Sequence, residues 1–160
     1  MVTKRMNPAV GVLNGEVWAI GGDSGRSGDL SSCERLDAVT GTWIRGPDMT
    51  MLRVGHHVAV LCGELWVVAR DCRSTERLDS ATNRWVRGPD NPLTRDSFAV
   101  AVFRGQLWVV GGSDEEGEVV SSCEFLDVAS NTWMAGPPHE RSSLRPQPCC
   151  AGWGAVGRRR

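Results

Sequence analysis

Short apolar runs alternate with turn-forming residues along this chain, and their order repeats. In the first unit, Ala9 to Leu13 and Glu16 to Ile20 are runs of β-forming residues on either side of Asn14-Gly15, the dipeptide most typical of a tight hairpin. A third run, Cys33 to Leu36, and a fourth, Thr42 to Arg45, flank a second turn. The pattern therefore predicts a unit of four antiparallel strands.

The same unit occurs three times, and one tryptophan of the pattern marks each copy, at positions 18, 66 and 108. Each copy then carries Glu-x-Leu-Asp, a second tryptophan and a Gly-Pro pair. Six of the seven tryptophans occupy repeat positions, namely Trp18, Trp43, Trp66, Trp85, Trp108 and Trp133. Copies spaced by 48 and then 42 residues are typical of propellers and repeat arrays, in which one unit cannot bury its apolar face without a neighbour.

Paired glycines follow the first tryptophan in two of the three copies, at Gly21-Gly22 and Gly111-Gly112. Glycine lacks a Cβ atom, so these positions permit a positive φ and a close approach of neighbouring backbones. The second copy has Ala69-Arg70 instead. We expect that unit to be locally altered or less stable there.

Together, the paired glycines, the strand tryptophans and the later Glu-x-Leu-Asp and tryptophan resemble the kelch repeat family. The resemblance covers three repeats at about residues 5–47, 51–89 and 93–137, with Trp18, Trp66 and Trp108 where the family usually carries tyrosine. It implies an all-β fold, a partial kelch β-propeller of three four-stranded antiparallel blades. We expect these repeats to fill residues 1–137, a divergent and disordered tail over 138–160, and no BTB-like or F-box-like partner domain.

The number of blades is unusual, since a closed propeller normally has about four to eight. Three blades leave the outer faces of the first and third blades without a neighbour. Three explanations stay open, in this order of preference: a truncated or divergent gene product, two copies that join as three plus three blades, or a partner chain that supplies the missing blades. We therefore expect a propeller that is open, or closed by oligomerisation.

Composition fits a β-rich globular protein, with 41% hydrophobic and 23% charged residues and no apolar run near the roughly 18 residues of a membrane helix. The N-terminus shows no secretory signal pattern, so we expect a cytoplasmic or nuclear protein. The six cysteines lack CxxC spacing, which favours free thiols over a zinc site. A net charge of −1 gives no support for nucleic-acid binding. We therefore expect no membrane, nucleic-acid, metal or cofactor partner.

One arginine stands 13 residues before the first tryptophan of each copy, in the connector that leads into the first strand: Arg5, Arg53 and Arg95. At this position they should recur around one mouth of the propeller. In kelch proteins that bind acidic peptides, arginines at this repeat position resemble these three and contact the ligand, consistent with the two-pronged bonds of guanidinium to carboxylate. The alternative is that they are solvated charges or intramolecular partners of Glu34, Glu76 and Glu124.

Enzyme interpretations find little support in the residues. A kelch-type copper radical oxidase requires tyrosine, and the chain contains none. His56 and His57 are adjacent, so on a strand they point to opposite faces and cannot easily share a metal ion. We therefore predict a module that binds a protein or an acidic peptide, used for substrate recognition in a ubiquitin ligase or for actin binding. The alternative is a remnant of a kelch-fold enzyme, such as a sugar epimerase or a specifier-type protein.

Overall fold

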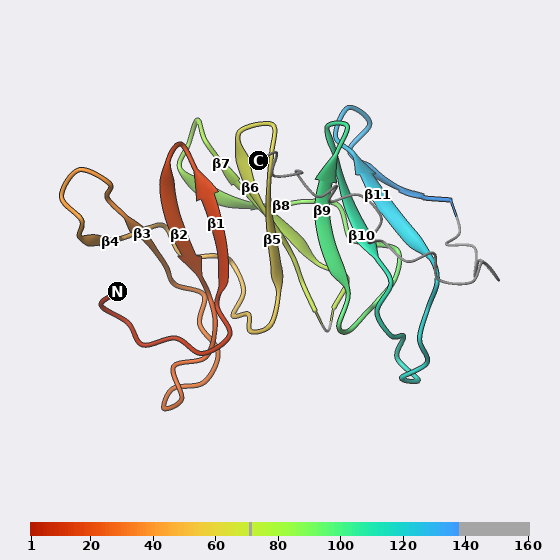
Figure 1. Cartoon of the computed structure of the whole chain (residues 1–160), viewed down its shortest axis with the longest axis horizontal. Coiled ribbons are helices and arrows are strands. Elements are labelled where there is room, and N and C mark those ends of the chain that lie inside the picture. The colour runs from red at the N-terminus through yellow and green to blue at the C-terminus, as the bar shows by residue number, and fades with distance from the viewer. Residues whose placement is uncertain (71, 138–160) are drawn as a thin grey trace, which may run out of the picture.

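The computed structural model describes residues 1–70 and 72–137, which form three four-stranded antiparallel sheets (Figure 1). The first sheet consists of β1 (Ala9–Leu13), β2 (Glu16–Ile20), β3 (Cys33–Leu36) and β4 (Trp43–Arg45). The second consists of β5 (His57–Leu61), β6 (Glu64–Val68), β7 (Thr75–Asp79) and β8 (Arg84–Arg87). The third consists of β9 (Ala99–Phe103), β10 (Gln106–Val110), β11 (Cys123–Asp127) and β12 (Thr132–Ala135). The predicted tail over 138–160 lies outside the described residues.

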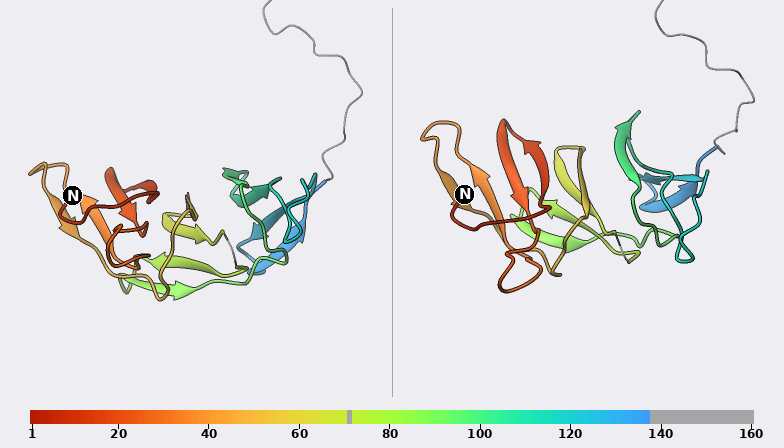
Figure 2. Two further views of the ribbon diagram at one scale, coloured as in Figure 1. Left: turned by 90° about the horizontal axis from the view of Figure 1, so that it is seen from below. Right: turned by 60° about the horizontal axis from the view of Figure 1, so that its bottom comes forward.

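The three sheets stand side by side as blades of an arc rather than a closed ring (Figure 2). Within each blade the strands follow chain order, and the first strand of each lies on the concave side of the arc. Strand β5 contacts both β1 and β9, so the first strands line the position of a propeller axis. The fold class is therefore confirmed as a partial, open propeller of three blades.

A two-residue hairpin opens each blade between its first and second strands. In blade 1 Leu13 pairs with Glu16, and the two residues between them, Asn14 and Gly15, have φ of 52° and 79°. Both central residues of a type I′ turn require positive φ, which asparagine and glycine tolerate best. The equivalent turns place Cys62 and Arg104 in the same left-handed conformation, at φ of 52° and 51°. The hairpin thus forms in all three blades although only the first carries the favourable dipeptide.

The hydrophobic core consists of two layers, one between each pair of adjacent blades. In the first layer, Trp18 and Ile20 of blade 1 pack with Leu65 and Val67 of blade 2. The second layer joins blades 2 and 3 and includes Trp66, which is 2% exposed. Burying one such large apolar side chain contributes about 1.5–3 kcal/mol relative to leaving it in water. Each blade is therefore stabilised mainly by its neighbours.

The tryptophan and Gly-Pro landmarks of the repeat are explained by two contacts. A Cβ atom added at Gly46 would lie 2.8 Å from Cζ3 of Trp18, so the indole ring needs glycine at this position. The adjacent carbonyl of Pro47 accepts a hydrogen bond of 3.0 Å from Nε1 of Trp85 in the next blade. Nε1 of Trp133 makes the same 3.0 Å bond to the carbonyl of Pro89. The repeat residues therefore join neighbouring blades as well as strands within a blade.

The glycine pairs have the backbone conformation that the sequence predicts. Gly22 and Gly112 have φ of 92° and 94°, and a Cβ atom at Gly22 would lie 2.7 Å from the carbonyl oxygen of Met6. Neither Ala69 nor Arg70 has a positive φ, so blade 2 takes a different path after β6. The expected local alteration of blade 2 is confirmed. A lower stability at this place stays a prediction.

Candidate functional site

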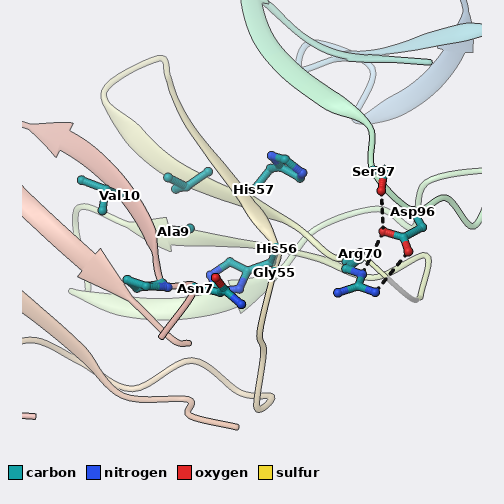
Figure 3. Close-up of a pocket in the computed structure, with 11 residues that line it drawn as sticks. Asn7, Ala9, Val10, Gly55, His56, His57, Arg70, Asp96 and Ser97 are labelled. Atoms are coloured by element: carbon teal, nitrogen blue, oxygen red, sulfur yellow. Dashed lines mark hydrogen bonds and ion pairs between the residues drawn. The ribbon is translucent and has the colours of Figure 1, made fainter. Parts of the chain in front are cut away.

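A cavity of about 610 Å³ lies where the connectors before β1, β5 and β9 converge (Figure 3). All three blades contribute to its wall. Its polar lining comes from the three connectors, the start of β5 and the segment after β6, and consists of Asn7, His56, His57, Arg70, Asp96 and Ser97. We call this cavity the mouth, because it opens at one end of the position that the propeller axis would occupy.

A left-handed residue recurs in each connector and brings the chain to the mouth. Asn7, Gly55 and Ser97 each stand 11 residues before the repeat tryptophan, with φ of 49°, 64° and 54°. Asparagine and glycine occupy this region at low cost, whereas serine does so less readily. All three residues line the mouth. Sequence reasoning missed this recurrence, because the serine in the third copy hides the preference for Asn or Gly.

His56 presents a buried imidazole to the mouth. The residue is 5% exposed, and its two buried ring nitrogens make no hydrogen bond of ordinary geometry in the described part of the chain, although the backbone of Ile20 is close enough to act on its pKa. Its ring lies over blade 1, where a Cβ atom at Gly21 would come within 2.7 Å of Cε1. Burial, reinforced by the positive charge of Arg53, lowers the pKa of His56 to about 4. At neutral pH the ring is uncharged, with one donor nitrogen and one acceptor nitrogen.

His57 turns away from His56, as adjacency on a strand predicts. Its ring lies 4.5 Å from the ring of Phe98 in blade 3, measured between centroids. Partial burial lowers the pKa of His57 as well. Among the described residues no group of three or more His, Cys, Asp or Glu side chains is placed to hold a metal ion.

Arg70 and Asp96 form a two-pronged ion pair across the rim of the mouth (Figure 3). Nε of Arg70 lies 2.9 Å from Oδ1 of Asp96, and Nη2 lies 3.1 Å from Oδ2. Burial alone would raise the pKa of Asp96, but hydrogen bonds from Arg70 and Ser97 outweigh it and lower the pKa. The arginine that replaces a repeat glycine thus joins blade 2 to the connector of blade 3. Its charge is balanced at the rim.

The three connector arginines, Arg5, Arg53 and Arg95, lie elsewhere. None of them lines the mouth, and their side chains are 0%, 3% and 2% exposed. Each pairs with the glutamate of its own blade, at 3.1 Å for Arg5 and Glu34, 2.8 Å for Arg53 and Glu76, and 2.6 Å for Arg95 and Glu124. The geometry supports the alternative stated above, in which these arginines are intramolecular partners. A role for them in binding a ligand stays a prediction.

Further hydrogen bonds show what these arginines do for the blade. Nη1 of Arg5 donates to the carbonyls of Gly21 and Ser32, at 2.8 Å and 2.6 Å. Nη1 of Arg95 donates to the carbonyls of Gly111 and Ser122 in the same way, at 2.8 Å and 3.1 Å. The guanidinium groups of Arg5 and Arg95 therefore fasten their connectors to the end of the second strand and the start of the third.

Comparisons with known proteins agree with this architecture. The family model of the kelch motif matches residues 4–50 and 94–139, which together are more than half of the chain. Its two matches cover the first and third blades, whereas the blade with Ala69-Arg70 is unmatched. No curated protein matches the sequence. No helix in the described part of the chain is long and apolar enough to cross a membrane.

The fold resembles that of many solved structures, 178 chains in all. One of these, titled "Structure of YjhT", superposes with a TM-score of 0.72 at 15% sequence identity. The match covers 86% of this chain and 53% of that one, so the present chain spans about half its length. At this identity the likeness shows the fold alone.

Proposed function

This chain belongs to the kelch motif family, and from that premise we propose that it is a protein-interaction module whose mouth binds a polypeptide segment. The observation that carries the proposal is the mouth itself, a cavity of about 610 Å³ to which every blade contributes. Its volume is in the range typical of ligand sites, about 300–1,000 Å³. Asn7 and Ser97 support the proposal, because both are exposed polar residues that line the mouth.

The chemistry of the mouth favours hydrogen-bonding groups over dense negative charge. His56 is neutral at physiological pH, and Arg70 is already paired with Asp96. A carboxylate of the ligand would have to compete with Asp96 for Arg70. We therefore propose a polar peptide segment, whose backbone N–H and C=O groups can pair with the exposed side chains of Asn7 and Ser97 in the mouth. The acidic peptide suggested by the connector arginines is the competing proposal.

Two cellular uses fit such a module. Substrate recognition for a ubiquitin ligase is the one we prefer, with actin binding as the second, and both would place the protein in the cytoplasm or nucleus. Both uses rest on the kelch membership. A remnant of a kelch-fold enzyme, such as a sugar epimerase or a specifier-type protein, is the alternative, and it requires turnover of a small substrate at the mouth without any peptide.

A random peptide library displayed on phage tests the proposal. Peptides selected on the full chain should bind the Asn7→Ala/Arg70→Ala double variant at least about tenfold more weakly, a change of about 1.4 kcal/mol. The matched control is Asn131→Ala/Arg45→Ala, which also removes a left-handed asparagine and an exposed arginine paired with an aspartate, away from the mouth. Unchanged binding in the mouth variant, or equal losses in both, would contradict the proposal. Enrichment of acidic peptides would favour the competing ligand class.

A further inference from the structure

Blade 3 presents an apolar face that no element of the described residues covers. Strand register places one side of β9 to β12 outward, away from blade 2. The side chains on this open face of blade 3 are Ala101, Phe103, Trp108, Val110, Phe125 and Met134. Phe103 is 56% exposed and Val110 is 41% exposed. An exposed patch of this kind is characteristic of an interaction surface.

Two of these positions, those of Phe103 and Val110, are buried in the blades that have a following blade. Phe103 corresponds in the repeat to Leu13, which is 7% exposed, and to Leu61, which is 2% exposed. Val110 corresponds to Ile20 and Val68, which are 0% and 2% exposed. The open face of blade 3 therefore has the composition of a surface that receives another blade.

Blade 1 presents the complementary face. Register places Val10, Val12, Val17, Leu36 and Trp43 on the side of blade 1 that points away from blade 2. Val10 and Val12 are each 58% exposed. Leu36 is partly exposed, whereas its equivalents Leu78 and Leu126 are buried in the two core layers. This open face of blade 1 corresponds to the surfaces by which blades 2 and 3 pack on the blade before them.

Neighbouring blades are joined by a hydrogen bond from a tryptophan to a proline carbonyl, and each open face carries one of these two groups without the other. Trp85 donates to Pro47, and Trp133 donates to Pro89, in each case from the fourth strand to the preceding blade. Trp43 is the equivalent donor of blade 1, and its Nε1 makes no hydrogen bond within residues 1–70 and 72–137.

The equivalent acceptor is the carbonyl of Pro137, at the end of blade 3. It receives a hydrogen bond from Sγ of Cys123 at 3.1 Å, as the carbonyl of Pro89 receives one from Oγ1 of Thr75 at 2.7 Å. Pro89 accepts the tryptophan bond in addition, because a carbonyl oxygen has two lone pairs. Pro137 therefore retains the capacity to accept from a tryptophan that lies where Trp133 lies on Pro89.

We propose that two copies of this chain associate head to tail, with blade 3 of each packed on blade 1 of the other, to form a ring of six blades. Both contacts would repeat the two blade interfaces already present within the chain. A head-to-tail contact closes into a ring only when the arc of each copy fits the ring. The present chain spans 53% of the structure titled "Structure of YjhT", so two copies supply as much chain as that fold contains. This inference goes beyond the proposed function, since the mouth lies within one copy.

The first test is the solution mass of the full chain, measured by light scattering during size exclusion. A dimer is expected. A monomer, or a series of larger open assemblies, would overturn the proposal.

A charged residue placed on either open face tests whether that face takes part in the dimer contact. Phe103→Glu and Val12→Glu should each shift the chain to monomer, because every head-to-tail contact uses one of each face. The control is Val39→Glu, a substitution at a residue that is 94% exposed in the turn between β3 and β4, and it should stay dimeric. A contact between two blade 3 faces would leave Val12→Glu dimeric, and a contact between two blade 1 faces would leave Phe103→Glu dimeric. Either result would overturn the head-to-tail arrangement.

Mixing the two variants completes the test. Phe103→Glu retains an intact blade 1 face and Val12→Glu retains an intact blade 3 face, so the mixture should regain one good contact and form a heterodimer. Trp43→Phe keeps an aromatic ring but removes the indole donor from both contacts, and it should weaken dimerisation about 25-fold, about fivefold for each contact. Trp133→Phe, which removes an internal copy of the same bond, should leave the dimer dissociation constant unchanged. No heterodimer in the mixture, or equal effects of the two tryptophan variants on dimerisation, would count against the proposed contact.

Discussion

Arg53 and Glu76 form a buried ion pair, 2.8 Å from Nη2 to Oε1, in which the two side chains are only 3% and 1% exposed. The backbone N–H of Thr50 donates a further hydrogen bond to Glu76, at 2.8 Å. The pair therefore fastens the connector between blades 1 and 2 to the third strand of blade 2. A charge pair in this position is a structural element of the blade, since neither partner reaches the mouth.

Loss of one partner should be costly. Arg53→Ala leaves the carboxylate of Glu76 buried without its counter-charge, and we expect a loss of about 3–5 kcal/mol in the free energy of unfolding. Urea denaturation of the full chain measures it. Arg45→Ala, which breaks an ion pair whose arginine side chain is 73% exposed, should cost at most about 1 kcal/mol. The double variant Arg53→Met/Glu76→Leu should be more stable than Arg53→Ala. Similar losses for Arg53→Ala and Arg45→Ala would contradict this interpretation.

Gly46 tests the contact between the Gly-Pro pair and the strand tryptophan. Gly46→Ala places a methyl group 2.8 Å from Cζ3 of Trp18, and we expect a loss of about 1–3 kcal/mol from overpacking. The same substitution should cost less in a Trp18→Phe background, because the smaller ring leaves room for the methyl group. Thermal or urea unfolding of the four proteins of this double-mutant cycle checks the prediction. Losses that add to within about 0.5 kcal/mol would show that the two residues do not interact.

His56 should make stability depend on pH. Its pKa is about 4 in the folded chain against 6.5 for an unperturbed histidine, so below pH 6.5 the unfolded state binds the extra proton first. The contribution of His56 to the free energy of unfolding is therefore full above about pH 6.5. It is lost as the pH falls towards 4, by about 2–4 kcal/mol in all. His56→Phe should remove this dependence.

Phenylalanine is a suitable replacement at position 56, because Phe98 occupies the equivalent position of blade 3. Unfolding free energies of both proteins at about pH 7.5 and about pH 5 provide the measurement. The variant should gain stability relative to the wild type as the pH falls, while the contribution of His57 remains in both. Parallel pH profiles would mean that His56 titrates normally.

Strand positions followed from local pattern with little error. The runs from Glu16 to Ile20 and from Cys33 to Leu36 are strands with the predicted bounds, and the fourth strand begins at Trp43 rather than Thr42. Period-two alternation and hairpin turns act within a few residues, so the sequence displays them directly. The contact of Gly46 with Trp18 was not predicted, because it depends on how the fourth strand passes the second.

The site was harder to predict. For Arg53 the sequence offered both a ligand contact, implied by the family resemblance, and a pairing with Glu76; the choice between them depends on packing between residues 23 positions apart. In the sequence, Arg70 was notable only because it replaces a repeat glycine, although it forms the rim of the mouth with Asp96. Sequence reasoning correctly separated His56 from His57 and had no means to show that the ring of His56 is buried.

The sequence by itself determined the repeat, the four strands of each blade and the family, because these depend on turn residues and side-chain alternation within short stretches. Tertiary structure alone decided which charges are buried, which polar groups meet at the mouth and which blade faces stay open. These features depend on distances between residues that are far apart in the chain. Burial also changes their chemistry, as the lowered pKa of His56 and the paired guanidinium of Arg53 show.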